Sequence, residues 1–225
     1  MVDESAWLDG TAIDAFMAWA IHKDIPFFEG VRDDFWAGVS FTQAQRFSWP
    51  LGTATTIYFP THLQVQFHNL VGLQSITTSP RCTASGYKEA ILLMEQALMI
   101  YNISQKHWVL FHLVVAESTL YAIDMYRSPL VDESHAYKFL EFLSTLLSKP
   151  AYLSYTIKIV TPEVDPCLPV QLDGYSCGVF TAVLAYHIMK RAKIHFEQCD
   201  ISEWRSFMLE KVLSLSTYHM RFDVV

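Results

Sequence analysis

The sequence contains no apolar run long enough to cross a membrane. A spanning helix needs roughly 20 consecutive apolar residues, and the longest apolar stretches, VLFHLVVA and GVFTAVLAY, are far shorter. The first ten residues, MVDESAWLDG, are acidic and lack the apolar core of a secretion signal. We therefore expect no membrane partner and no secretion signal in this stretch.

Basic residues are also scarce. The 225 residues include 16 Lys and Arg against 23 Asp and Glu, a formal net charge of −7. Nucleic-acid binding depends on clustered Lys and Arg, which contact phosphates. No segment alternates basic and aromatic residues as a platform for single strands would. We expect no nucleic-acid partner, whereas a partner with a basic surface would suit an acidic chain.

Cysteines are few and scattered. Cys82, Cys167, Cys177 and Cys199 form no CxxC pair, and no histidine follows them at zinc-finger spacing. We expect free thiols and no metal site. Free thiols are typical of the nucleus or cytoplasm, which would be that of a host cell if a virus or an effector system encodes the chain.

Apolar residues, by contrast, are plentiful at 52%, which is enough to fill the core of one domain spanning residues 1–225. Helices and strands are segregated along the chain, so we predict an α+β fold with a mostly antiparallel sheet. Between residues 31 and 85 we expect only short elements in long loops. The periodicity predicts helices over 11–23, 85–96, 132–147, 177–192 and 202–216, and strands over 97–103, 107–116, 120–126 and 153–161.

Cys177, in the stretch QLDGYSCGVF, is the candidate nucleophile. It begins a predicted helix, and the partial positive charge of a helix N-terminus favours the reactive thiolate. Gly178 leaves the backbone open to a substrate that approaches the sulfur. The alternative is a small buried cysteine under a turn. The other three cysteines have no such setting, and we expect them to be inert.

A catalytic cysteine needs a base and a group that orients the base. His107 begins one strand of a predicted hairpin and Asp124 lies near the end of the next, so antiparallel pairing can bring them side by side. We expect His112 and His187 to be packed or surface residues. The backbone N–H of Cys177 and the side-chain amide of Gln171 are candidate donors to an oxyanion.

Three segments, WLDGTAIDAF, HWVLFHLVVAESTLYAID and QLDGYSCGVF, together resemble Ulp1-type cysteine proteases. These are the SUMO and NEDD8 proteases, with adenovirus protease as a more distant relative. The resemblance implies a papain-like or adenain-like fold with the nucleophile at a helix N-terminus. It also implies four catalytic roles: nucleophile for Cys177, general base for His107, orienting acid for Asp124 and oxyanion donor for Gln171.

The same resemblance implies a substrate site formed by Trp7, Asp9, Trp108 and Gly178. Two indoles would enclose the narrow Gly-Gly tail of a ubiquitin-like modifier, in a slot too tight for side chains. Two departures concern the modifier's identity. The family often has Asn-Asp where this chain has Asp9-Gly10, and often Asp where it has Ser176.

We therefore expect a monomeric thiol protease, an isopeptidase that cleaves after the Gly-Gly of a SUMO-like modifier, with NEDD8 or ubiquitin as other candidates. No cofactor is expected. Two alternatives stay open: an acetyltransferase of the same clan, and a non-catalytic module that binds ubiquitin-like proteins. Both would use the same fold.

Overall fold

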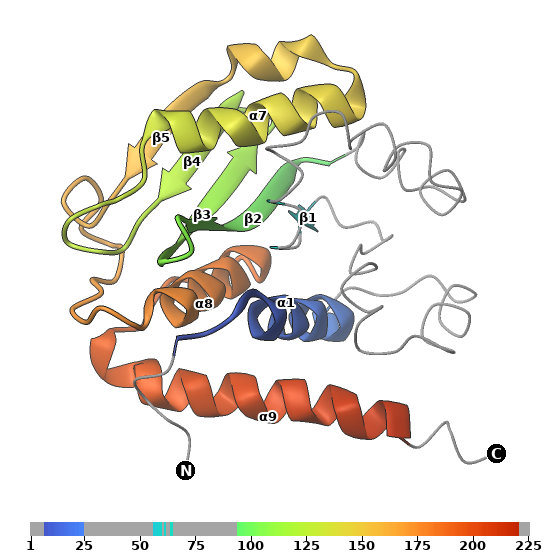
Figure 1. Ribbon diagram of the computed structural model, residues 1–225, viewed down its shortest axis with the longest axis vertical. Coiled ribbons are helices and arrows are strands. Elements are labelled where there is room, and N and C mark those ends of the chain that lie inside the picture. The colour runs from blue at the N-terminus through green and yellow to red at the C-terminus, as the bar shows by residue number, and fades with distance from the viewer. Residues whose placement is uncertain (1–6, 25–55, 60, 62–63, 65–93, 221–225) are drawn as a thin grey trace.

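The computed structural model describes residues 7–24, 56–59, 61, 64 and 94–220 (Figure 1). The short elements and long loops expected over 31–85 therefore fall almost entirely outside the described residues. So does most of the helix expected over 85–96, whose last residue, Gln96, begins a strand instead.

The described strands form one mixed sheet in the order β1-β2-β3-β4-β5. Its central pairs, β2 with β3 and β3 with β4, are antiparallel, while β1 and β5 each add a parallel edge. The antiparallel pairing that the sequence predicts is therefore found in the β2–β3 and β3–β4 pairs, and not at the two edges of the sheet. The strands are β1 Thr56–Phe59, β2 Gln96–Ile103, β3 His107–Val114, β4 Thr119–Ile123 and β5 Thr156–Val160.

Helices cover both faces of the sheet (Figure 1). Successive side chains of a strand point to opposite faces, so Trp108 and Leu110 of β3 pack with α8, while Val109 and Phe111 pack with α7. Helix α1 lies beside α8 on the same side of the sheet, and α9 lies farther from the sheet than both. The helices are α1 Gly10–Asp24, α7 Glu133–Leu147, α8 Cys177–Met189 and α9 Ile201–Met220, with the 3-10 turns η2 Pro150–Ser154 and η3 Gln198–Asp200.

Helix α8 is apolar on all sides because it is enclosed by the sheet, α1 and α9. Its residues from Cys177 to Ala185 are all buried. A helix of this kind belongs in a protein core or a membrane, but no helix in the described part of the chain has the length and apolarity needed to span a bilayer. The enclosure by three elements gives the start of α8 a rigid position.

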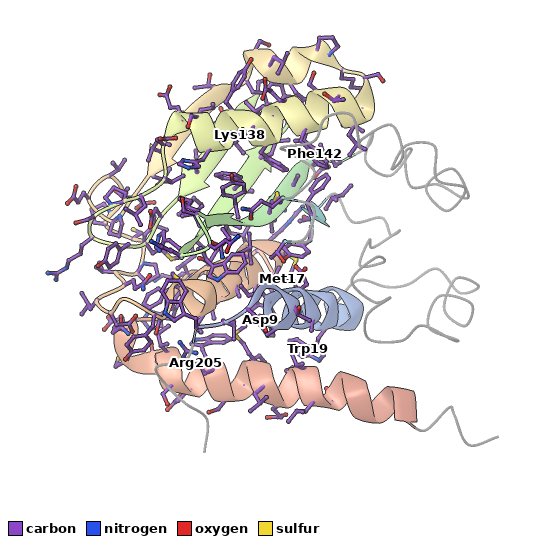
Figure 2. All side chains as sticks on the ribbon, viewed as in Figure 1. Asp9, Met17, Trp19, Lys138, Phe142 and Arg205 are labelled. Carbon is purple, nitrogen blue, oxygen red and sulfur yellow. The ribbon has the colours of Figure 1, made fainter. Side chains whose placement is uncertain are left out.

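Helix α1 packs against the core through an apolar face and is hydrogen-bonded to β1 through a buried carboxylate. Ile13, Phe16, Met17 and Ala20, which the sequence places on one helical face, are all buried. Trp19 lies between α1 and α9, against Phe207 (Figure 2). The expected core-facing side of this helix is therefore confirmed.

The buried carboxylate is that of Asp14. Its oxygens accept hydrogen bonds from the Tyr58 hydroxyl at 2.8 Å and from the backbone N–H and hydroxyl of Thr61 at 2.8 and 2.9 Å. Burial, and then the charge and hydrogen bond of Asp14, raise the pKa of Tyr58 well above its ordinary value. This cluster ties α1 to the end of β1.

Asp14→Ala should lower the free energy of unfolding by about 3 kcal/mol, because it leaves buried donors on Tyr58 and Thr61 without their acceptor. Asp14→Asn keeps one acceptor oxygen and should cost clearly less. Urea denaturation of both variants measures the difference. Equal stability of Asp14→Ala and the wild type would contradict the anchoring role.

Candidate active site

His107 and Asp124 meet at one end of the β3–β4 hairpin. The register pairs Leu110 with Ile123, so the first residue of β3 and the first residue after β4 lie at the same end of the two strands. The His107 Nε2 and Asp124 Oδ1 atoms are 2.8 Å apart. The contact expected from the hairpin is present.

Asp124 is held in one orientation by the backbone that follows it. Its side chain is fully buried, with 0% exposed. Oδ1 accepts the N–H of Tyr126 at 3.0 Å, and Oδ2 accepts those of Leu130 and Val131 at 2.8 and 3.4 Å. A carboxylate fixed by three N–H groups can fix in turn the ring that it contacts.

Cys177 is the first residue of α8 and is almost fully buried. Burial lowers the pKa of His107, but hydrogen bonds to Asp124 and Cys177 and their charges outweigh it and raise the pKa to about 9. The imidazole thus has a carboxylate on one side and the thiol on the other. A protonated ring between them is the natural partner of a thiolate.

Gln171 reaches this cluster through its backbone. Its N–H donates to the carbonyl of Met125, the residue after Asp124, at 2.8 Å, and it forms a parallel bridge with Tyr126. Its side-chain Nε2 donates to the backbone oxygen of Asp173 at 2.8 Å. The backbone of Gln171 therefore lies beside the residues that follow Asp124, and its side-chain amide lies against Asp173.

Trp108 is largely buried, with 7% exposed, and binds the N-terminal segment. Its indole Nε1–H donates to the carbonyl of Leu8 at 2.9 Å. Trp7, which directly precedes Leu8, is 48% exposed. Trp108 therefore fixes the backbone beside Trp7.

The structure explains the glycine at position 178 by close packing rather than by access of a substrate to the sulfur. A Cβ at this position would lie 3.0 Å from Leu8 Cβ and 3.1 Å from Trp108 Cδ1. The space is taken by these two residues, so glycine serves close packing of α8 against Trp108 and the N-terminal segment. Access of a substrate to the Cys177 sulfur is therefore not needed to explain the glycine at this position.

Asp9 and Gly10 begin α1. Asp9 is exposed, and its Oδ1 caps the helix by accepting the N–H of Ala12 at 2.8 Å, as its place before the apolar pattern predicts. A Cβ on Gly10 would lie 2.6 Å from Thr61 Oγ1. A carboxylate at this second place, common in the resembling family, is excluded here unless Thr61 moves.

Ser176 replaces the aspartate that is common before the nucleophile. It is buried, and its hydroxyl lies 3.4 Å from Nη2 of Arg205 on α9, the helix on which Figure 2 labels this residue. Arg205 Nη2 is also 3.4 Å from the carbonyl of Tyr175. Helix α9 thus contacts the backbone just before Cys177.

The competing histidines lie elsewhere. Burial lowers the pKa of His112 to about 4, and its Nε2 contacts Gln96 Oε1 at 2.9 Å. His187 Nδ1 donates to the carbonyl of Val183 at 2.8 Å, and its ring stacks on Phe196 within the core. Both are packed residues, as expected, and neither contacts Cys177.

Of the remaining cysteines, Cys167 and Cys199 are exposed and unpaired in any disulfide, while Cys82 lies outside the described residues. Within the described ranges no group of three His, Cys, Asp or Glu side chains could hold a metal ion.

Three site residues were not predicted from the sequence. The Thr181 hydroxyl lies 2.7 Å from the carbonyl of Cys177 and 3.1 Å from that of Trp108, and so joins α8 to β3. Asp173 and Gln198 support the loop before Cys177. The sequence does contain a signal for Asp173, because an Asp side chain in a turn commonly accepts the N–H groups two and three residues later. It contains no such signal for Thr181 or Gln198.

No protein-family model and no curated protein matches the sequence. The fold does match solved structures. The SUMO protease Ulp1, with its catalytic cysteine oxidised to a sulfenic acid, has a TM-score of 0.64 and 16% identity over 94% of this chain and 80% of that one. The C-terminal Ulp1 protease domain in complex with SMT3, the yeast orthologue of SUMO, has a TM-score of 0.60 and 16% identity, with 92% and 77% covered.

The Xanthomonas campestris effector XopD, bound to ubiquitin, matches with a TM-score of 0.54 and 14% identity over 95% of this chain and 93% of that one. The chain has a Ulp1-like protease fold. This similarity confirms the α+β, papain-like or adenain-like fold class inferred from the sequence. At identities of 16% and below, these matches show the fold alone.

The raised pKa of His107 predicts a pH-dependent contribution to stability. A group whose folded pKa exceeds its unfolded value of about 6.5 stabilises the fold fully below that value, and the contribution is lost as pH rises through about 9. His107→Gln should therefore destabilise the protein by about 1–2 kcal/mol more at pH 6 than at pH 9.5. Urea denaturation at both pH values measures this; the same loss at each would contradict it.

Proposed function

We propose that this chain is a cysteine-type isopeptidase that cleaves after the C-terminal Gly-Gly of a ubiquitin-like modifier. A SUMO-like modifier is the leading candidate, and NEDD8 and ubiquitin are the other candidates. The observation that carries the proposal is the buried contact of His107 Nε2 with Asp124 Oδ1 at 2.8 Å, next to the Cys177 thiol at the start of α8. It occurs on a Ulp1-like fold.

In the proposed reaction the Cys177 thiolate attacks the carbonyl carbon of the last glycine. The carbonyl electron pair moves to oxygen, where the N–H of Cys177 and the amide of Gln171 donate to it. His107, protonated and oriented by Asp124, gives its proton to the leaving amine as the C–N bond breaks. Water then attacks the thioester carbonyl while His107 accepts its proton, and the C–S bond breaks to release the modifier and restore the Cys177 thiolate beside protonated His107.

The N–H of Cys177 suits this role because the first N–H groups of a helix have no acceptor within the helix. Further along this end of the helix, Val179 and Phe180 both donate to the carbonyl of Ser176. The helix N-terminus also favours negative charge on both the sulfur and the oxyanion.

Trp108, whose indole lies beside the residue after the nucleophile, supports the proposed substrate class. Trp108 packs directly on Gly178, and it holds the backbone next to the exposed Trp7. Two indoles at this place suit a tail without side chains. Complexes of the fold relatives with SMT3 and with ubiquitin support a modifier of this class.

A panel of SUMO, NEDD8 and ubiquitin carrying C-terminal vinyl methyl esters tests the proposal. We expect at least one probe to form a covalent adduct with the wild type and none with Cys177→Ser. His107→Ala should lower turnover of the matching modifier by at least about 100-fold, with modifier affinity within twofold.

Failure of every probe to label the wild type would overturn the isopeptidase proposal. Labelling that persists in Cys177→Ser would overturn the choice of nucleophile. Acetylation of Cys177 by acetyl-CoA in the absence of modifier would favour the acetyltransferase alternative. Modifier binding without any adduct would favour the non-catalytic module.

A further inference from the structure

Gln198, far from the nucleophile in sequence, joins the C-terminal part of the chain to the loop that carries Gln171. It lies on η3, directly before α9. Its Oε1 accepts the backbone N–H of Leu172 at 2.7 Å, and its Nε2 donates to Asp173 Oδ2 at 2.6 Å. One side-chain amide therefore contacts two consecutive residues of that loop.

Asp173 in turn contacts both the turn that leads to Cys177 and the side chain of Gln171. Its Oδ1 accepts the N–H groups of Tyr175 and Ser176 at 3.0 and 2.8 Å, which shapes the turn leading to Cys177. Its backbone oxygen and Oδ1 lie 2.8 and 3.3 Å from Gln171 Nε2. Both candidate oxyanion donors, the Gln171 amide and the start of α8, are thus connected to this one residue.

The charge state of Asp173 is consistent with this arrangement. Burial raises its pKa, but hydrogen bonds from Ser176, Tyr175 and Gln198 outweigh that and lower the pKa. An ionised carboxylate accepts from several donors at once and cannot donate. It therefore holds the N–H groups around it in one arrangement.

We propose that Gln198 is a positioning residue for the oxyanion donors, acting through Asp173 on the Gln171 amide and on the turn before Cys177. The inference rests on the proposed function, because the oxyanion forms in that reaction. Leu172 is exposed and its N–H has Gln198 as its acceptor. Without Gln198 the Leu172–Asp173 segment loses its link to η3, and the Gln171 amide loses a fixed partner.

Gln198→Met tests the proposal because it keeps the length of the side chain and removes both hydrogen bonds. Cys199→Ala, the exposed neighbour on η3, is the matched control. For hydrolysis of a modifier–aminomethylcoumarin substrate we expect Gln198→Met to lower kcat roughly tenfold or more, with KM within twofold, since misplaced donors weaken transition-state binding. The control should match the wild type.

A double-mutant cycle separates positioning from general destabilisation. In a Gln171→Ala background, Gln198→Met should lower kcat by less than about threefold, because the main group that it positions is gone. Alkylation of Cys177 by iodoacetamide, followed on the Cys177 peptide by mass spectrometry, forms no oxyanion and should stay within twofold of the wild-type rate. An unchanged kcat, or an equal loss in both backgrounds, would overturn the proposal.

A substrate-free measurement distinguishes this inference from the proposed function. The side-chain NH₂ resonances of Gln171, identified by their loss in Gln171→Ala, should shift in Gln198→Met and not in Cys199→Ala. If no modifier is hydrolysed by the wild type, the proposed function fails, and these resonances still decide whether Gln198 positions the amide. Unchanged resonances would overturn the positioning role.

Discussion

The contact between His107 and Asp124 is the constraint on which the rest of the site depends. It forms because two antiparallel strands end at the same level, and because Asp124 is fully buried and bound by three backbone N–H groups. A buried carboxylate is costly unless its acceptors are satisfied. The loop from Tyr126 to Val131 satisfies them, and so the imidazole has one stable position.

A second constraint brings Cys177 to that imidazole. Helix α8 is enclosed by the sheet, α1 and α9, so its start can lie at only one place relative to β3. Trp108 sets the spacing: it packs on Gly178, binds Leu8, and shares the Thr181 hydroxyl with the carbonyl of Cys177. The start of α8 and the N-terminal segment are therefore both positioned by Trp108, the residue directly after His107.

Much of the fold could be predicted from the sequence because its signals are local. Strands β2 to β5 and helices α1, α7, α8 and α9 occur where apolar periodicity places them. The extent of the helices differs at their ends: α8 stops at Met189, before the left-handed Arg191, and α9 continues to Met220. Strand β1 was not predicted, because four residues carry too little periodicity to stand out.

The sequence by itself determined the chemistry: which residue is the nucleophile candidate, which histidine and acid accompany it, and which fold could carry them. These follow from residue types at short spacings and from three recognisable segments. Only the tertiary structure decided how the site is supported. Gly10 against Thr61, Gly178 against Trp108, and Gln198 against Asp173 join residues distant in the chain. Such contacts depend on how the helices and the sheet pack together, which local patterns do not encode.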